Sequence, residues 1–416
     1  MTELTEGELF PAPEPADTDR HAGATTTGLM PSQLLREAVA AGREIMSPQP
    51  IGDPQIQPAS IDLRLGEVAY RVRASFLPGS RASVRDKLDL LSMHRIDLTQ
   101  GAVLEKDGVY IAPLFEYVAL RKRTSALANP KSSIGRLDVF ARVITDYGTE
   151  FDRIREGYKG PLYAEISPRS FSILVRTGSS LVQLRIRRGS PAFSDTALRR
   201  LHEEVGLVEA PRLTGPGDKT AGSRPAAREA IRDGLAFAVD VAGDEHSGIV
   251  GYKARRHTDL IDVDRIRHYD PRDFWEPVYA HRGPGGAERP GGIVLDPHDF
   301  YILASREAVV VPPDHAAEMV PYDATVGEFR VHYAGFFDPG FGSAEAQGTG
   351  SRAVLEVRSH EVPFLIEDGQ VIGRLVYERL IARPDKLYGR DIGSSYQSQG
   401  LALSKHFKTD EAVTVR

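Results

Sequence analysis

An internal repeat restricts the fold of this 416-residue chain more than any other feature of its sequence. The segment GAVLE at 101–105 aligns with GIVLD at 292–296, an offset of 191 positions (292 − 101). Matching residues then recur without a gap over more than seventy positions: Tyr110 with Tyr301, Ile111 with Ile302, Glu116 with Glu307, Val118 with Val309, Glu165 with Glu356, Gly178 with Gly369 and Leu184 with Leu375. Such a register predicts that the two halves are diverged copies of one domain.

Both copies are rich in short runs of alternating apolar and polar residues, such as 60–65 and 117–120, bounded by Gly, Pro, Asn and Asp. Alternation predicts half-buried β-strands, and many short strands are typical of sandwiches, jelly rolls and barrels. Helices are predicted only from a Ser32 cap to Gly42, and from Ser194 or Asp195 to Gly206. The sequence therefore predicts a mainly β protein.

The domain boundaries follow from changes in composition. We expect a disordered leader at 1–28, which is acidic and rich in proline, and a first β domain at 29–210. A linker is expected at 211–226, because this stretch lacks apolar periodicity. The second β domain then occupies 227–416.

The composition excludes several classes of protein. With 52 basic and 58 acidic side chains the formal net charge is −6, so we expect no nucleic-acid partner. No run approaches the ~18 apolar residues of a membrane-spanning helix, and no secretory signal is recognised, so we expect a cytoplasmic protein. The absence of cysteine excludes disulfides and the cysteine ligands of zinc deaminases. The basic cluster Arg185, Arg187 and Arg188 is interpreted as a solvated strand edge.

A polar turn at 130–136, PKSSIGR, lies between two strand-like runs. Hydroxyl groups, backbone N–H groups and arginine together suit a chain of phosphates, because they satisfy several oxygens and arginine can bind two at once. An ordinary serine-rich turn is the alternative. Only the first copy has this chemistry, since the offset places Asp323, Ala324 and Gly327 at the corresponding positions of the second.

Two glutamates, Glu165 and Glu356, occupy the same position of the repeat, each in the middle of a strand-like run. A carboxylate is unusual there. Beside a base ring and away from water, it could move protons near neutral pH. The alternative is a solvent-facing residue or a structural hydrogen-bond acceptor, and both roles stay open at this point.

The segment 332–341, HYAGFFDPGF, is predicted to form an aromatic β-hairpin with a turn at Asp-Pro-Gly. Such a hairpin can hold a base or sugar, with Asp338 accepting a hydrogen bond from a sugar hydroxyl. An ordinary core hairpin is the alternative. The first copy keeps an acid, Asp146, near the corresponding place, but in a longer and more charged segment.

Seven segments in order resemble the dCTP deaminase family of the dUTPase-like superfamily, in its long, duplicated bacterial form. They are PASIDLRLG (58–66), NPKSSIGRLDVF (129–140), GYKGPLYAEISPRS (157–170), VHYAGFFDPGF (331–341), AVLEV (353–357), IGRLVYERL (372–380) and YGRDIGSSYQSQG (388–400). The resemblance implies two tandem dUTPase-like domains, each a distorted β-barrel or jelly roll with a few short helices. It also implies hydrolytic deamination of dCTP to dUTP and ammonia, with Mg²⁺ carried by the triphosphate and no catalytic zinc.

The resemblance further implies roles for individual residues. The glutamate that follows the hairpin is the proton acceptor and donor, so Glu356 is the first choice and Glu165 the second, while Ser132 helps to place the attacking water. The other expected substrate contacts are Lys131, Ser132, Ser133 and Arg136 at the phosphates, Asp338 at the sugar, Ala334 at the water, Val354 and Leu355 next to the glutamate, and Tyr388 and Gln399 in a C-terminal lid segment.

The sequence departs from the family pattern at Lys131, where arginine is usual, and at Ser395, where lysine is usual. Neither copy is complete, because the first has the serine turn and the second has the hairpin. Family members are trimers with sites between subunits, so we expect a homo-oligomer with composite sites, within one chain or between two. The alternatives are a dUTPase-like or bifunctional enzyme that forms dUMP, and a nucleotide-binding protein without activity.

Overall fold

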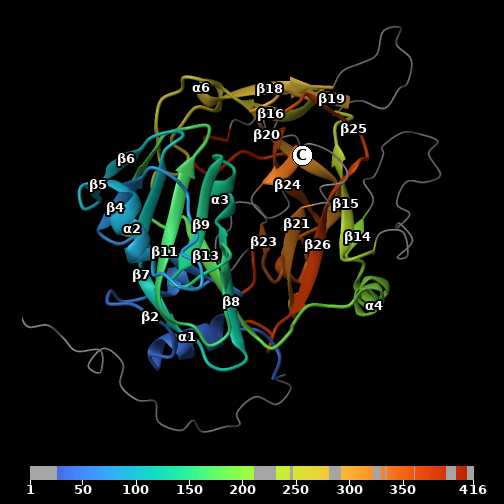
Figure 1. The fold of residues 1–416 in the computed structure, drawn as a ribbon. Coiled ribbons are helices and arrows are strands. Elements are labelled where there is room, and N and C mark those ends of the chain that lie inside the picture. Colours follow the sequence, from blue (N-terminus) through green and yellow to red (C-terminus); the bar gives the residue numbers. More distant parts are fainter. Residues whose placement is uncertain are drawn as a thin grey trace, which may run out of the picture.

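The computed structural model describes residues 26–209, 231–243, 247–280, 292–321, 329–332, 335–359, 361–389 and 400–409. Two mainly β domains lie side by side, the first coloured blue to green and the second yellow to red (Figure 1). No helix in these ranges is long and apolar enough to cross a membrane. The expected tandem, mainly β architecture is confirmed. The predicted leader up to residue 25 and the linker at 211–226 lie outside the described residues.

In the described part of the first domain, one sheet has the order β1-β13-β8-β10 with β3 on β13, and a second has the order β5-β4-β7-β11-β9 with β2 on β7. Its elements are β1 (Gly28–Leu29), α1 (Ser32–Ala40), β2 (Glu44–Met46), η1 (Asp53–Gln55), β3 (Ile61–Leu63), β4 (Val68–Val72), α2 (Val84–Leu91), β5 (Ser92–Asp97), β6 (Ala102–Leu104), β7 (Val109–Ala119), β8 (Thr124–Pro130), α3 (Ser132–Gly135), β9 (Val139–Thr145), β10 (Arg153–Ile154), β11 (Lys159–Pro168), β12 (Ile173–Val175) and β13 (Val182–Arg188).

The second domain is built around one large sheet with the order β18-β16-β20-β15-β26-β21-β23, to which β14, β22 and β24 also pair. Its elements are α4 (Asp195–Val205), β14 (Val208–Glu209), β15 (Leu235–Asp240), β16 (Ile249–Ala254), β17 (Ile261–Asp262), α6 (Pro271–Phe274), β18 (Trp275–Tyr279), β19 (Gly292–Leu295), β20 (Phe300–Val309), β21 (His315–Pro321), β22 (Phe329–His332), β23 (Phe336–Phe337), η3 (Ala344–Ala346), β24 (Ser351–Ser359), β25 (Phe364–Glu367) and β26 (Val371–Arg379).

The strand pairing reproduces the sequence repeat. Glu165 of β11 lies opposite Ile111 of β7, and Glu356 of β24 lies opposite Ile302 of β20. A side-chain contact is repeated as well, because the Tyr110 hydroxyl accepts from the backbone N–H of Glu105 at 2.9 Å and its counterpart, Tyr301, accepts from Asp296 at 3.0 Å. The two halves are therefore copies of one domain in structure as well as in sequence.

The boundary between the domains lies before α4 rather than at residue 210. Leu198 and Leu201 of this helix belong to the hydrophobic core of the second domain, and β14 pairs with β20. As predicted, Ser194 caps the helix by accepting from the N–H of Ala197, and Gly206 ends it at a φ of +70°. The apolar face of α4 thus packs on the sheet that follows it in the chain.

One connection packs differently in the two domains and contributes to their association. Residues 255–274, between β16 and β18, form a bridging arm whose strand β17 pairs in parallel with β12 of the first domain. Asp262 of the arm accepts two hydrogen bonds from Arg176, at 2.7 and 2.8 Å. The corresponding connection of the first domain, 73–91, folds back on its own domain, where α2 packs against β4.

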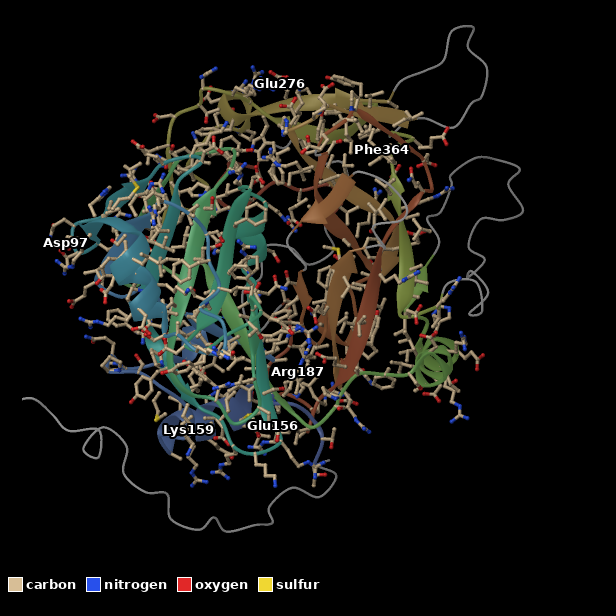
Figure 2. The ribbon with its side chains drawn as sticks, viewed as in Figure 1. Asp97, Glu156, Lys159, Arg187, Glu276 and Phe364 are labelled. Atoms are coloured by element: carbon tan, nitrogen blue, oxygen red, sulfur yellow. The ribbon has the colours of Figure 1, made fainter. Side chains whose placement is uncertain are left out.

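A second part of the interface joins β13 of the first domain to β21, β23 and β26 of the second (Figure 1). Arg187 of β13, labelled in Figure 2, donates to Glu318 of β21 at 3.1 Å and also pairs with Glu378 of β26 at 2.9 Å. The solvated edge predicted for the basic cluster is wrong in part, because Arg185 is fully buried and Arg187 mostly so. These cations neutralise carboxylates of the other domain.

Two further predictions are corrected. The helix at Ser32 is present, but Ser32 does not cap it; its hydroxyl donates to Asp385 of the second domain. The turn predicted at Asp-Pro-Gly is present, because the N–H of Phe341 donates to the carbonyl of Asp338 at 3.1 Å and Gly340 has a φ of +96°. The strand that returns from this turn to pair antiparallel with β22 is the later β24, so the hairpin extends beyond the segment 332–341, and β23 pairs separately with β21.

Candidate active site

The serine turn follows directly after β8 and forms the short helix α3. Lys131 forms an ion pair with Asp62, and its backbone N–H donates to the carbonyl of Leu181 at 2.9 Å. Ser133 and Arg136 are buried. The Arg136 Nη1 donates to the carbonyls of Ala402 at 3.1 Å and Leu403 at 3.4 Å, so the turn is held in place by the C-terminal segment.

Glu356 lies in β24, between β20 and β22, and only 4% of its surface is exposed. The pKa of its carboxyl is raised to about 8, mainly by burial, against the opposing effect of the Arg136 guanidinium and with a smaller contribution from Asp138 in the same direction as burial. The turn of the first domain and the glutamate of the second therefore come together within one chain. A buried carboxyl with a pKa near neutrality suits proton transfer in both directions.

The raised pKa predicts how stability depends on pH. Folded Glu356 holds its proton up to about pH 8, whereas its ordinary pKa is 4.5, so between these values the folded protein binds more protons than the unfolded chain. The carboxyl therefore lowers the free energy of unfolding by about 1.4 kcal/mol for each pH unit of rise in this range. Glu356→Gln, which mimics the neutral form, is expected to lack this decline. Denaturant unfolding of both proteins at several pH values measures it, and parallel curves would contradict it.

A second pair of charges crosses the interface beside the glutamate. Arg358, two residues after Glu356, forms an ion pair with Asp138, two residues after Arg136. The Ser170 hydroxyl donates to the same carboxylate at 2.6 Å. Alternation along a strand places Arg358 on the face of β24 that carries Glu356. This contact fixes the distance between β24 and the turn.

Asp338 follows β23 and is also bound across the interface. Arg185 donates to its carboxylate at 3.0 Å and to the carbonyls of Phe337 and Ala317, both at 2.9 Å. The guanidinium carbon lies 4.0 Å from the ring centre of Phe336. Burial raises the pKa of Asp338, and Arg185 opposes the rise.

Glu165, the counterpart of Glu356, has different surroundings. It is buried, forms an ion pair with Arg142 and accepts from the Ser75 hydroxyl at 2.8 Å. The Arg142 guanidinium lies 3.8 Å from the ring centre of Phe151. Ser75 belongs to the connection that folds back on the first domain, so this connection closes over the position that corresponds to Glu356. This geometry suits the structural role that the sequence left open.

The other predicted site residues are placed as follows. Val354 joins the core cluster that includes first-domain residues, whereas the Leu355 side chain lies in the core of the second domain. The backbone N–H of Tyr388 donates to the carbonyl of Pro339 at 2.8 Å, next to Asp338. Asp146 accepts from the N–H of Val84 at the start of α2. Ala334, Ser395 and Gln399 lie outside the described residues.

Several residues at the interface were not predicted from the sequence. Arg358, Asp138 and Ser170 lie far apart in the chain and share no motif. Arg185 was noticed only as part of a basic cluster, and Ser404 and His406 gave no signal. Strand alternation could have drawn attention to Arg358, since it places this residue on the same strand face as Glu356.

Comparison with known proteins agrees with this division. A family model for the 2'-deoxycytidine 5'-triphosphate deaminase (DCD) N-terminal domain matches residues 26–190, and one for the C-terminal domain matches residues 194–407. The chain belongs to the dCTP deaminase family. A solved structure of 2'-deoxycytidine 5'-triphosphate deaminase from Agrobacterium tumefaciens is 50% identical, with a TM-score of 0.76, and the match covers 87% of this chain and 100% of that one.

Curated members of the dCTP deaminase family match shorter stretches. The dUMP-forming dCTP deaminase of Halobacterium salinarum is 34% identical over 26% of this chain and 52% of its own length. The dCTP deaminase of Halorubrum lacusprofundi is 26% identical over 32% of this chain and 63% of its own length. The chain thus spans about half to two thirds of the length of these relatives.

Proposed function

We propose that this protein hydrolyses dCTP to dUTP and ammonia, with Glu356 as the group that moves protons. The observation that carries the proposal is this buried carboxyl of the second domain, whose pKa is raised to about 8 and on which the Arg136 guanidinium of the serine turn acts electrostatically. The family membership supports the choice of substrate. The proposed reaction does not use a zinc ion bound by protein side chains.

The proposed reaction uses Glu356 twice. Its carboxylate takes a proton from water while the water oxygen forms a bond to C4 of cytosine. The carboxyl then gives this proton to the exocyclic nitrogen, the C4–N bond breaks, and ammonia leaves. The second water proton ends on N3 of the uracil ring. Ser132 and backbone dipoles of the turn hold the water, and general acid–base catalysis of this kind contributes about 10²–10⁴ in rate.

Binding of the nucleotide is assigned to both domains. We assign the phosphates, with the Mg²⁺ that they carry, to Lys131, Ser132 and Ser133, and the sugar to Asp338. Arg136 is buried and bound to backbone carbonyls, which favours a place beside Glu356 and the water over a phosphate contact. Tyr388 and Gln399 are proposed to close over the triphosphate, together with the rest of the C-terminal lid segment.

The expected homo-oligomer and a cytoplasmic location also belong to this proposal. The turn and Glu356 meet inside one chain, so oligomerisation is not needed to bring this pair together. An oligomer would instead add contacts around a pair that each chain already contains.

A product assay tests the function. Purified protein is incubated with dCTP and Mg²⁺, and ammonia, dUTP, dUMP and pyrophosphate are measured together. We expect ammonia and dUTP in equal amounts. The name of the Halobacterium relative favours dUMP formation as a second candidate, which would add dUMP and pyrophosphate. If no product forms while dCTP raises the melting temperature, the protein binds nucleotide without turnover and the proposal fails.

A further inference from the structure

The described C-terminal residues 402–407, named the C-terminal latch here, run between the bridging arm and the serine turn. On the arm side, backbone hydrogen bonds join the N–H of Arg267 to the carbonyl of Lys405 at 2.9 Å and the N–H of Tyr269 to the carbonyl of His406 at 3.1 Å. Phe407 completes an aromatic cluster, with its ring centre 5.5 Å from that of Phe274 and 6.0 Å from that of Trp275. The latch is thus fixed to the second domain by both backbone and packing.

On the other side, the latch is bonded to the serine turn of the first domain. The Ser404 hydroxyl donates to the carbonyl of Ser133 at 2.7 Å. Arg136 reaches the carbonyls of Ala402 and Leu403 from the other end of the turn. The guanidinium that acts electrostatically on Glu356 is therefore held by the latch, and the turn that carries it is held there as well.

His406 is fully buried and supports Ser404 from behind. Its Nε2 lies 2.9 Å from the carbonyl oxygen of Val263 in the arm, and its Nδ1 lies 2.7 Å from the Ser404 hydroxyl. A carbonyl can only accept, so Nε2 must carry a hydrogen. Burial and, to a smaller extent, Lys405 lower the pKa of His406 to about 4, against the opposing effects of the hydrogen bond to the Val263 carbonyl and of Asp264 and Asp262.

With the ring in this state, His406, Ser404 and the carbonyl of Ser133 have one hydrogen too few for both hydrogen bonds of Ser404 at neutral pH. Nδ1 of the neutral ring is an acceptor, and so is the carbonyl of Ser133, whereas the Ser404 hydroxyl has a single hydrogen. Ser404 can satisfy only one of them at a time. The strength of the hydrogen bond from Ser404 to the turn therefore depends on whether the group at the Nδ1 position of residue 406 accepts the Ser404 hydrogen.

We propose that Ser404 and His406 are positioning residues for the reaction, which set how firmly the serine turn, and with it Arg136, is held within electrostatic range of Glu356. The inference rests on the proposed function for its kinetic consequence. Neither side chain is placed in contact with the substrate. Their effect passes through the carbonyl of Ser133, at one end of the turn, while Arg136 binds the latch at the other. A displacement of catalytic groups by about 1 Å can reduce the rate by about 10²-fold.

The variants are chosen to separate positioning from packing. Ser404→Ala removes the hydroxyl, and Ser404→Thr restores one. In His406→Asn the amide lies near the Nδ1 position and can donate to Ser404, whereas in His406→Gln it lies near Nε2 and reaches only Val263. Lys408→Ala, at an exposed residue just beyond the latch, is the matched control.

We expect Ser404→Ala to reduce kcat for dCTP about 10- to 100-fold, with KM changed much less. Ser404→Thr should recover most of the loss. Both His406→Asn and His406→Gln remove the acceptor that competes with the Ser133 carbonyl for the Ser404 hydrogen, so neither should reproduce this loss. Because Arg136 would no longer lower the pKa of Glu356, the midpoint of the pH–rate profile that reports this carboxyl should rise in Ser404→Ala. A merely structural role would not move this midpoint.

Hydrogen exchange of the backbone amides at 131–138, without nucleotide, gives a readout that does not need activity. Faster exchange in Ser404→Ala than in Lys408→Ala supports the proposal. Kinetics, pH midpoint and exchange of Ser404→Ala equal to those of Lys408→Ala would overturn it, and so would a loss in His406→Gln equal to that in Ser404→Ala. If the unaltered protein releases no ammonia, the proposed function fails, whereas the exchange result still decides whether the latch holds the turn.

Discussion

Glu356→Gln is expected to lower kcat for dCTP deamination by about 10²- to 10⁴-fold while dCTP still binds. Glutamine keeps the size of the side chain and can still form hydrogen bonds, but it can neither take a proton from water nor return one. Since the carboxyl of the free protein has a pKa of about 8, the amide also resembles the neutral form that the fold already accommodates. Ammonia release measures kcat, and the rise of the melting temperature with dCTP measures binding.

Glu165→Gln is the matched comparison, because Glu165 occupies the same position of the repeat in β11 that Glu356 occupies in β24. Its carboxylate is bound by Arg142 and Ser75, so the substitution should weaken folding of the first domain rather than the chemical step. The kcat of the folded variant should therefore stay close to that of the unaltered protein. If Glu165→Gln loses turnover and Glu356→Gln keeps it, the assignment is reversed.

Those features of the fold that depend on local sequence pattern could be predicted. The repeat offset predicted that Glu165 corresponds to Glu356 and Ile111 to Ile302, which the strand pairing of both domains confirms, and capping residues predicted α4. The hairpin was predicted in its turn but not in its extent, because β22 pairs with the later β24 while β23 pairs with β21. Local pattern does not specify which strand is the partner.

The interface could not be predicted for the same physical reason. Arg185 lies in an ordinary cluster of basic residues, and only the partner domain decides whether it meets water or Asp338. The bridging arm and the 73–91 connection differ in which domain they pack on, a choice that depends on long-range contacts. The prediction of a composite site did not depend on knowing such long-range contacts. It followed from comparing the two copies, each of which lacks a motif that the other has.

Arg185→Met is expected to lower the free energy of unfolding by about 3–5 kcal/mol, because it leaves the buried carboxylate of Asp338 without its cation. Methionine can still pack on the ring of Phe336. The carbonyls of Phe337 and Ala317 lose a donor as well, which adds to the loss. Denaturant unfolding with two spectroscopic probes measures the change and tests whether the transition stays two-state.

The double substitution Arg185→Met with Asp338→Asn separates charge from packing. Neutralising Asp338 removes the unpaired charge, so the double variant should be clearly more stable than Arg185→Met alone, by an interaction energy of about 1–3 kcal/mol. Recovery should be partial, since the two carbonyls still lack the arginine. Additive losses would mean that the pair is not coupled. Coupling would mean that β23, which presents Asp338, is held by electrostatics from the first domain, so that the incomplete copies depend on each other for folding as well as for the site.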